Sequence, residues 1–380
     1  SNLGGGEKET RGQGDKGMRI NSLTPNSSLL YRRSTATSLH SMYCSGCGSK
    51  VGGNVLSTVL RRIQESQLTE REDIVIGLSS TDDAAVMKVP TGKVMVQTID
   101  YFTSLINDPY IFGQISVNHC LSDIFAMGAV PTSVLALATI PYGKSSTVEE
   151  TLFQLLSGAV KQLNQARVSL IGGHTIQGEK LAFGLSCNGL ADEKQLLRKS
   201  GMQRNDVLIL TKALGTGVLF AGEMRLQVKG SWIDNAIKSM LVSNQAAAVS
   251  FLEFGATACT DITGFGLIGH LSEMVKASKI GVELQLSKIP ILDGARETVE
   301  KGIFSSLYPE NLQASSYITN YQDFELNCNY PLLFDPQTSG GLLASVSAEK
   351  ADSCLEKLKE LGYEDAEVIG NVGGEGIKLV

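Results

Sequence analysis

The chain has 380 residues, a formal net charge of −6 and 42% hydrophobic residues, so it is long enough for two or three domains and a large core. This charge balance excludes a chain that is basic overall and would bind nucleic acid or an anionic membrane through its net charge. No apolar run reaches the roughly 18 residues of a membrane span. Seven scattered cysteines, an odd number without a repeating pattern, predict free thiols and an intracellular, cytoplasmic protein.

Residues 1–42 differ in composition from the rest of the chain. They are rich in Gly, Ser, Thr and Asn, and residues 1–43 carry six basic and three acidic side chains. Such a segment buries too little apolar surface to offset the entropy of ordering, so we expect a disordered tail. The absence of any acid between Lys16 and Gln64 is also typical of an organelle-targeting segment, or of a linker.

The pattern of apolar residues predicts alternating helices and strands from residue 43 onward. Helices are expected over 54–64, 109–128, 148–166, 215–224, 234–254, 267–278 and 348–361. Strands are expected over 93–100, 134–140, 168–171, 181–190, 207–212, 258–261, 282–286, 342–346 and 366–369. In the first of these, Val94, Val96, Thr98 and Asp100 would share one face. A polar segment at 191–206 suggests a boundary between a domain at 43–195 and a second at 196–380. Both parts are predicted to be α/β or α+β.

Aspartates recur at the edges of the expected elements. Asp82 and Asp83 lie in a short polar stretch, Asp100 ends a strand, Asp123 lies in a helix and Asp261 ends another strand. An ordinary surface turn would explain the Asp82-Asp83 pair by itself. Separated carboxylates of this kind are, however, the ligands that a hard divalent cation needs. The sequence therefore favours a metal-bridged nucleotide site.

Glycine-rich segments could supply the phosphate-binding part of such a site. The chain has no Gly-x4-Gly-Lys-Ser/Thr loop, and Gly215-Thr216-Gly217 lacks the third glycine of a dinucleotide site. Gly172-Gly173-His174-Thr175 follows a short expected strand, where backbone N–H groups could cradle a phosphate. An ordinary tight turn is an equally good explanation of that segment.

Two further groups of side chains could carry chemistry. Cys44 and Cys47 form a Cys-x2-Cys pair, but no second pair completes a structural zinc site. Cys47 lies between two glycines, and Lys50 could lower its thiol pKa or hold an anion. His119 shares a helix face with Asp123, and we interpret it as a buried structural residue.

Six segments, in this order, resemble the selenophosphate synthetase (selenide, water dikinase) family. The DDAAV and GGHT segments also occur in the wider aminoimidazole-ribonucleotide-synthetase (PurM-like) superfamily. The Cys-Gly-x-Lys loop is what narrows the resemblance to the selenophosphate synthetase family within it. The family often has a second cysteine where this chain has Ser49, so a role for that thiol would need Cys44 as a substitute. The segments are Gly46–Lys50, Thr81–Val86, Ser122–Gly128, Gly172–Thr175, Thr260–Gly266 and Asp335–Gly341.

The resemblance implies a fold and a reaction. It implies a two-domain PurM-like protein in which N-terminal strands of two subunits form a barrel across a homodimer, beside a C-terminal α/β domain. It implies that ATP, selenide and water give selenophosphate, AMP and orthophosphate, with Mg²⁺ required and K⁺ a further candidate cofactor. A selenium-delivery protein is a candidate partner.

The resemblance also implies roles for individual residues. Cys47 is the position of the catalytic cysteine or selenocysteine, and Lys50 is the essential phosphate-contacting lysine. Asp83, Asp123 and Asp261 would hold Mg²⁺. The expected ATP-binding residues are Lys50, Ser80, Thr81, Asp82, Asp100, Asp123, Gly173, His174 and Thr175, of which the glycine-histidine-threonine loop would come from the partner subunit.

Two alternatives stay open at this stage. The chain could be another superfamily kinase or synthetase that uses the same ATP site without the cysteine. It could also be a metal- or redox-binding module built on Cys44 and Cys47. Selenide-dependent formation of AMP distinguishes the first alternative from the family reaction, and one zinc per chain would support the second.

Overall fold

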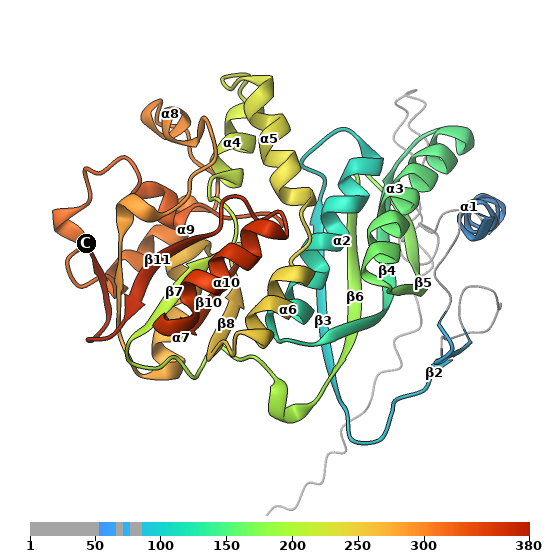
Figure 1. The fold of residues 1–380 in the computed structure, drawn as a ribbon. Helices are drawn as coiled ribbons and strands as arrows, with labels where there is room; N and C mark the ends of the chain where they lie inside the picture. The colour runs from blue at the N-terminus through green and yellow to red at the C-terminus, as the bar shows by residue number, and fades with distance from the viewer. Residues whose placement is uncertain (1–52, 66–70, 77–85) are drawn as a thin grey trace, which may run out of the picture. The chain divides into compact units, whose positions relative to one another are not determined.

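The computed structural model describes residues 53–65, 71–76 and 86–380 (Figure 1). All of them belong to one compact unit of the chain, Ser45–Val380. Residues 1–52, 66–70 and 77–85 lie outside the described residues. These segments contain the expected tail and the candidate site residues Cys47, Lys50, Ser80, Thr81, Asp82 and Asp83.

Helices and strands alternate along the described chain, as the sequence predicts. The α-helices are α1 (Gly53–Glu65), α2 (Pro109–Ala126), α3 (Ser145–Ala166), α4 (Thr216–Glu223), α5 (Gly230–Leu241), α6 (Gln245–Glu253), α7 (Gly266–Ser278), α8 (Ala295–Glu300), α9 (Tyr308–Asn311) and α10 (Ala348–Glu360). The strands are β1 (Ile74–Ile76), β2 (Val86–Met87), β3 (Val94–Thr103), β4 (Val130–Pro141), β5 (Ser169–Gly178), β6 (Ala182–Ala191), β7 (Asp206–Leu210), β8 (Ala258–Asp261), β9 (Val282–Leu284), β10 (Leu342–Ser347), β11 (Glu367–Val372) and β12 (Ile377–Leu379).

The first large sheet has four strands in the order β3-β6-β4-β5. Strand β6 pairs antiparallel with both β3 and β4, whereas β4 and β5 are parallel. Helices α2 and α3 pack against this sheet, and α1 packs on α3 (Figure 1). Burial alternates along β3, so that Val96, Thr98 and Asp100 share the inner face as predicted, while Ile99 and Tyr101 are exposed.

The second large sheet has six strands in the order β12-β9-β11-β7-β10-β8. Its pairs are antiparallel except for β12 with β9. Val207 and Ile209 of β7 pack into the same apolar cluster as α6 and α10, whereas Leu208 and Leu210 pack into a second cluster with α7. Every residue of β7 is buried, because helices cover both faces of this sheet.

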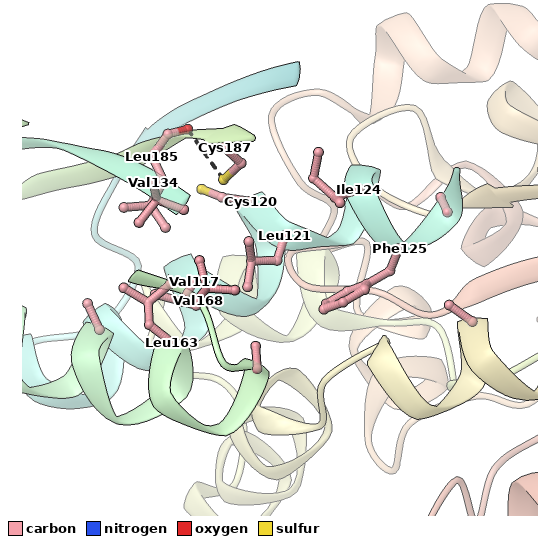
Figure 2. Packing of buried hydrophobic residues seen from close by; sticks show 14 of the residues in the cluster. Val117, Cys120, Leu121, Ile124, Phe125, Val134, Leu163, Val168, Leu185 and Cys187 are labelled. Atoms are coloured by element: carbon pink, nitrogen blue, oxygen red, sulfur yellow. Dashed lines mark hydrogen bonds between the residues drawn. The ribbon is translucent and has the colours of Figure 1, made fainter. Parts of the chain in front are cut away.

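Helix α2 is mostly buried, and it packs against α3, α5 and the strands β3 and β6. The Asp108 side chain accepts the Ile111 N–H at 2.9 Å, Pro109 begins the helix, and Gly128 follows its end with a φ of +67°. Leu121 packs with apolar residues of α3, β4 and β6 (Figure 2). None of the described helices, α2 included, is long and apolar enough to cross a membrane.

The expectation of one helix over 234–254 is wrong. The chain forms α5 and α6 there and breaks between them, because Val242 adopts an extended conformation with ψ of 120°. The Asn244 side chain then turns toward Ser122 and Gly340 instead of continuing a helical surface. A buried side-chain contact made across the fold thus overrides the local helical pattern.

The expectation of a loop at Gly172–Thr175 is also wrong. These residues form the middle of β5, which pairs with β4 through Gly173↔Ala136 and His174↔Leu137. A Cβ atom at Gly173 would come within 2.2 Å of the Ala136 carbonyl oxygen. Glycine is therefore needed at position 173 for close strand pairing, and the segment continues the strand that the sequence predicted to stop at residue 171.

Candidate active site

A cavity of about 610 Å³ contains three of the predicted site residues. Asp100 comes from β3, Asp123 from α2 and Asp261 from the end of β8. The loops that carry Thr263 and Thr338 complete the lining. Segments that lie far apart in the sequence thus bring three carboxylates to one concave surface.

A hydroxyl group holds the Asp123 carboxylate in place. Thr98 Oγ1 donates to Asp123 Oδ2 at 2.6 Å, and Thr98 lies on the inner face of β3 together with Asp100. The alternation of β3 therefore places an acid and the hydroxyl that orients a second acid side by side. Nothing in the sequence alone gives Thr98 a role, although its position two residues before Asp100 is a usable signal.

Burial and mutual repulsion both act on the carboxylates. Burial, reinforced by the negative charge of Asp123, raises the pKa of Asp100 to about 6. Burial also raises the pKa of Asp261 to about 7, and Asp123 adds to this effect, whereas a hydrogen bond from Ser122 opposes it. Acids that destabilise each other's charge in this way are suited to a bound cation.

The three carboxylates are not a complete metal site by themselves. Among the described residues, no group of three or more His, Cys, Asp or Glu side chains is placed to hold a metal ion. The expected third ligand, Asp83, lies outside the described residues. The set Asp83, Asp123 and Asp261 is therefore untested as a whole.

His119 borders the acids, and its ring is held in one orientation. The Ser339 N–H donates to His119 Nδ1 at 3.0 Å, so the proton of the neutral ring lies on Nε2, which is 4.0 Å from Asp100 Oδ2. Burial lowers the pKa of His119 to about 4, and nearby Lys212 also lowers it, against an opposing effect of Asp123. His119 is thus only partly buried, because it also lines the cavity, and it links Asp100 to the Asp335–Gly341 segment.

The Asp335–Gly341 segment anchors the start of α4 beside the cavity. Asp335 Oδ2 accepts the Gly217 N–H at 3.0 Å, and Gln337 Oε1 accepts the Gly215 N–H at 3.0 Å. A Cβ atom at position 217 would approach Asp335 Oδ1 to 2.5 Å, which explains the glycine there. The sequence marked this segment only through the family resemblance, because such long-range hydrogen bonds leave no local pattern.

Other predicted residues lie apart from the cavity. Gly173, His174 and Thr175 border a separate small hollow of about 70 Å³ on β5. Within the described part of the chain, they are not among the residues that line the carboxylate cavity. Their expected contribution to the site of a partner subunit is untested.

The fold and the sequence define the class of protein. Residues 81–191 match the family model described as AIR synthase related protein, N-terminal domain, and residues 203–380 match that of the C-terminal domain. The fold is similar to that of thiamine-monophosphate kinase from Stenotrophomonas maltophilia K279a, with a TM-score of 0.64 and 20% identity, covering 87% of this chain and 97% of that chain. Hydrogenase maturation protein HypE in complex with ATP is also similar, with a TM-score of 0.64 and 17% identity, covering 87% and 88%. The two-domain PurM-like fold expected from the sequence is confirmed.

Relatives of higher identity give a narrower class. Selenide, water dikinase of Clostridioides difficile (strain 630) is 35% identical over 340 residues, covering 88% of this chain and 95% of the relative. Selenide, water dikinase of Caldanaerobacter subterraneus subsp. tengcongensis is 36% identical over 335 residues, covering 86% and 93%. The chain belongs to the selenide, water dikinase family.

Proposed function

We propose that the protein makes selenophosphate from ATP, selenide and water, releasing AMP and orthophosphate. The product would supply selenium for selenocysteine and selenated tRNA. The observation that carries this proposal is the cavity that joins Asp100, Asp123 and Asp261 in a chain of the selenide, water dikinase family. We further propose that residues 43–195 form the ATP-binding domain and residues 196–380 the second domain.

The acids fit a divalent cation. Asp261 is buried, and its pKa is raised to about 7 mainly by burial and then by the charge of Asp123, so a cation between them would relieve both effects. We assign Mg²⁺ to Asp83, Asp123 and Asp261, with K⁺ as a further candidate. Bound Mg²⁺ would neutralise charge on phosphate oxygens during transfer.

The protein's own residues would bind and orient the nucleotide. Thr98 fixes the Asp123 carboxylate, and Ser339 fixes the His119 ring beside Asp100. With these groups held before binding, little reorganisation is needed when the triphosphate enters the cavity. The residues assigned to ATP are Lys50, Ser80, Thr81, Asp82, Asp100 and Asp123, together with Gly173, His174 and Thr175 of a partner subunit.

The described cysteines are poor candidates for handling selenide. Burial raises the thiol pKa of Cys120, Cys187, Cys259 and Cys354, which keeps these groups protonated. Cys328 is exposed, but it does not line the carboxylate cavity. These observations favour Cys47 as the catalytic thiol, with Lys50 nearby in the sequence to promote its ionisation.

An apolar face of the first sheet that no described residue covers supports the homodimer. On β3, Ile99 is 61% and Tyr101 48% exposed, and Met95 lies on the same exposed face. Strands from two subunits could close a barrel over these side chains, which would remove a large apolar surface from water. Ile99→Lys should convert the dimer to a monomer in light scattering. An unchanged mass would argue against this interface.

Phosphorus NMR of the full chain with ATP, Mg²⁺ and selenide tests the reaction. We expect selenophosphate, AMP and orthophosphate in equal amounts, and no AMP without selenide. Accumulation of ADP without selenophosphate would indicate another kinase on the same fold.

Cys47→Ser should reduce selenophosphate formation by orders of magnitude, because a serine hydroxyl is a weak nucleophile at neutral pH. Cys44→Ser is the matched control and should be nearly silent.

A further inference from the structure

We propose that Lys212 is a positioning residue that acts through Ser339 to hold His119 with its Nε2–H group facing the nucleotide cavity. The inference rests on the proposed function, because the cavity is assigned there to ATP. Lys212 follows β7, Ser339 lies in the Asp335–Gly341 segment, and His119 lies in α2. Among the described residues that line the carboxylate cavity, His119 is present and Lys212 is not. Any effect of the lysine on the site must therefore be transmitted.

The backbone of Ser339 has a conformation that needs support. Its φ of +51° lies in the left-handed region, which a residue with a Cβ atom rarely adopts, and the residue is 2% exposed. Such conformations persist only where the surrounding contacts hold them. Three hydrogen bonds do so here, and each uses a different group of Ser339.

These three hydrogen bonds tie Ser339 to three other parts of the fold. Its N–H donates to His119 Nδ1 at 3.0 Å, and its hydroxyl donates to the Met240 carbonyl oxygen at 2.7 Å. Its own carbonyl oxygen accepts from Lys212 Nζ at 3.0 Å. The N–H and the carbonyl group lie on either side of the Ser339 Cα, so φ and ψ of this residue relate their directions. Holding the carbonyl therefore constrains where the N–H points.

The contact with Ser339 determines which nitrogen of His119 carries the proton. A backbone N–H can only donate, so Nδ1 accepts and the proton of the neutral ring lies on Nε2. Burial lowers the pKa of His119 to about 4, so the ring is neutral near pH 7. Nε2 lies 4.0 Å from Asp100 Oδ2, and both residues line the cavity. The ring thus presents a hydrogen-bond donor to the space that we assign to the triphosphate.

Packing alone does not account for Lys212. It is 4% exposed, and its hydrogen-bond partners among the described residues are the backbone carbonyl oxygens of Ser339 and Val242. A buried ammonium group that contacts carbonyl groups but no carboxylate is unfavourable. Val242 follows α5, so the lysine also caps this helix end. Asn118 already donates to two other carbonyl oxygens there, so capping by itself does not require a buried charge.

The direct test is the tautomer of His119 in the full chain without nucleotide. In ¹⁵N-histidine-labelled protein, a ring that keeps its proton on Nε2 has two widely separated nitrogen shifts, and exchange between tautomers brings them together. The chain has four histidines, and loss of signals in His119→Phe assigns the ring. Lys212→Met keeps the approximate side-chain size but removes the donor. It should move the two His119 shifts toward each other.

Nucleotide binding connects the tautomer to the site. Binding of a non-hydrolysable ATP analogue with Mg²⁺ is followed by calorimetry. Lys212→Met and His119→Phe should each weaken binding about 10-fold, as expected for the loss of one hydrogen bond to a charged group. The double variant should bind no more weakly than either single variant, because the lysine acts through the ring.

Asn118 provides a matched control at the same helix end. Its Nδ2 donates to the carbonyl oxygens of Met240 and Leu241 at 3.2 and 2.8 Å and does not contact Ser339. Asn118→Leu should lower thermal stability, leave the His119 shifts unchanged and keep affinity for the analogue within about twofold of wild type.

Thermal unfolding verifies that every variant folds. If Lys212→Met does not fold, Lys212→Gln replaces it. The glutamine amide keeps a donor, but it is too short to hold both carbonyl oxygens, so the same change in the His119 shifts is expected.

Three results would overturn the inference. Unchanged His119 shifts in the Lys212 variant would show that the ring is held without the lysine. The same change of shifts in Asn118→Leu would indicate general loosening of the helix end. Additive losses of affinity in the double variant would show that Lys212 does not act through His119. Absence of analogue binding in the wild type would instead overturn the proposed function, whereas the His119 shifts would still test the link from Lys212 through Ser339.

Discussion

One side of helix α2 packs Val117, Leu121 and Phe125 into the apolar core (Figure 2). The other side turns His119 and Asp123 toward the cavity. The core side stabilises the fold by removing apolar surface from water, an effect that hardly depends on pH. The cavity side carries polar groups whose burial is unfavourable until a partner compensates them. The core-facing side of α2 thus stabilises the helix, and the cavity-facing side presents its polar groups for binding.

Substitution of Asp123 should have the largest effect on activity. Asp123→Asn keeps the shape of the side chain but removes the charge that faces both Asp100 and Asp261. Selenide-dependent AMP formation should fall about 100- to 1,000-fold, as is usual when one preorganised electrostatic group is lost. The metal-free variant should unfold at the same temperature as wild type or higher. Activity near the wild-type level would remove Asp123 from the site.

Substitution of Leu121 should lower the stability of the fold and leave ATP binding nearly unchanged, the opposite of what is expected for Asp123. Leu121 lies two residues before Asp123 and is 1% exposed in the core. Leu121→Ala should lower the free energy of unfolding by about 2–5 kcal/mol through lost burial and a cavity. At temperatures where the variant is folded, KM for ATP should stay close to wild type. A large rise in KM with little loss of stability would mean that the two sides of α2 are not separable.

The pH dependence of stability should separate the two sides further. The pKa of Asp261 is about 7 in the folded protein, above the usual value of an aspartate, so the folded state binds more protons than the unfolded state between about pH 4 and 7. The contribution of Asp261 therefore becomes less favourable as pH rises through this window. His119, whose pKa is lowered to about 4, acts in the opposite direction between about pH 4 and 6.5.

Comparison of Asp261→Asn with wild type isolates the contribution of Asp261 to the pH dependence of stability. In urea unfolding without metal, Asp261→Asn should be more stable than wild type at pH 8, where the wild-type carboxylate is a buried charge. The difference should shrink as pH falls below about 7 and disappear near pH 4, where the aspartate is protonated in the unfolded state as well. A difference that is constant between pH 5 and 8 would contradict the raised pKa.

The smallest expected effect concerns the thiols on the core side. Cys120 and Cys187 face each other between α2 and β6, and burial raises the pKa of both thiols (Figure 2). At pH 8 a thiol-specific reagent should label exposed Cys328 much faster than either of them, with no loss of fold. Rapid labelling of Cys120 in the native protein, detected by mass spectrometry of peptides, would show that the core side opens readily.

Local patterns were sufficient for much of the fold. The alternation along β3 predicted the face shared by Thr98 and Asp100, and Pro109 and Gly128 correctly bracketed α2. The boundaries failed where a distant contact decides the conformation. Close pairing with β4 extends β5 through Gly173, and a side-chain contact across the fold breaks the chain before Asn244.

The candidate site was predictable only in part for the same reason. Asp100, Asp123 and Asp261 could be named because acids at the edges of elements are visible in the sequence, and the structure brings them to one cavity. The supporting contacts of Ser122 and Ser339 could not be named, because each depends on residues more than 100 positions away. Serines of this kind look like ordinary small residues until the fold aligns their partners.

The central claim is that the cavity beside α2 binds the metal and the nucleotide together. A crystal structure with Mn²⁺ and a non-hydrolysable ATP analogue tests it directly, because anomalous scattering locates the manganese. We predict manganese at the carboxylates of Asp123 and Asp261, with the triphosphate in the same cavity. Nucleotide and manganese bound elsewhere, for example in the cavity of about 540 Å³ beside Lys212, would contradict it.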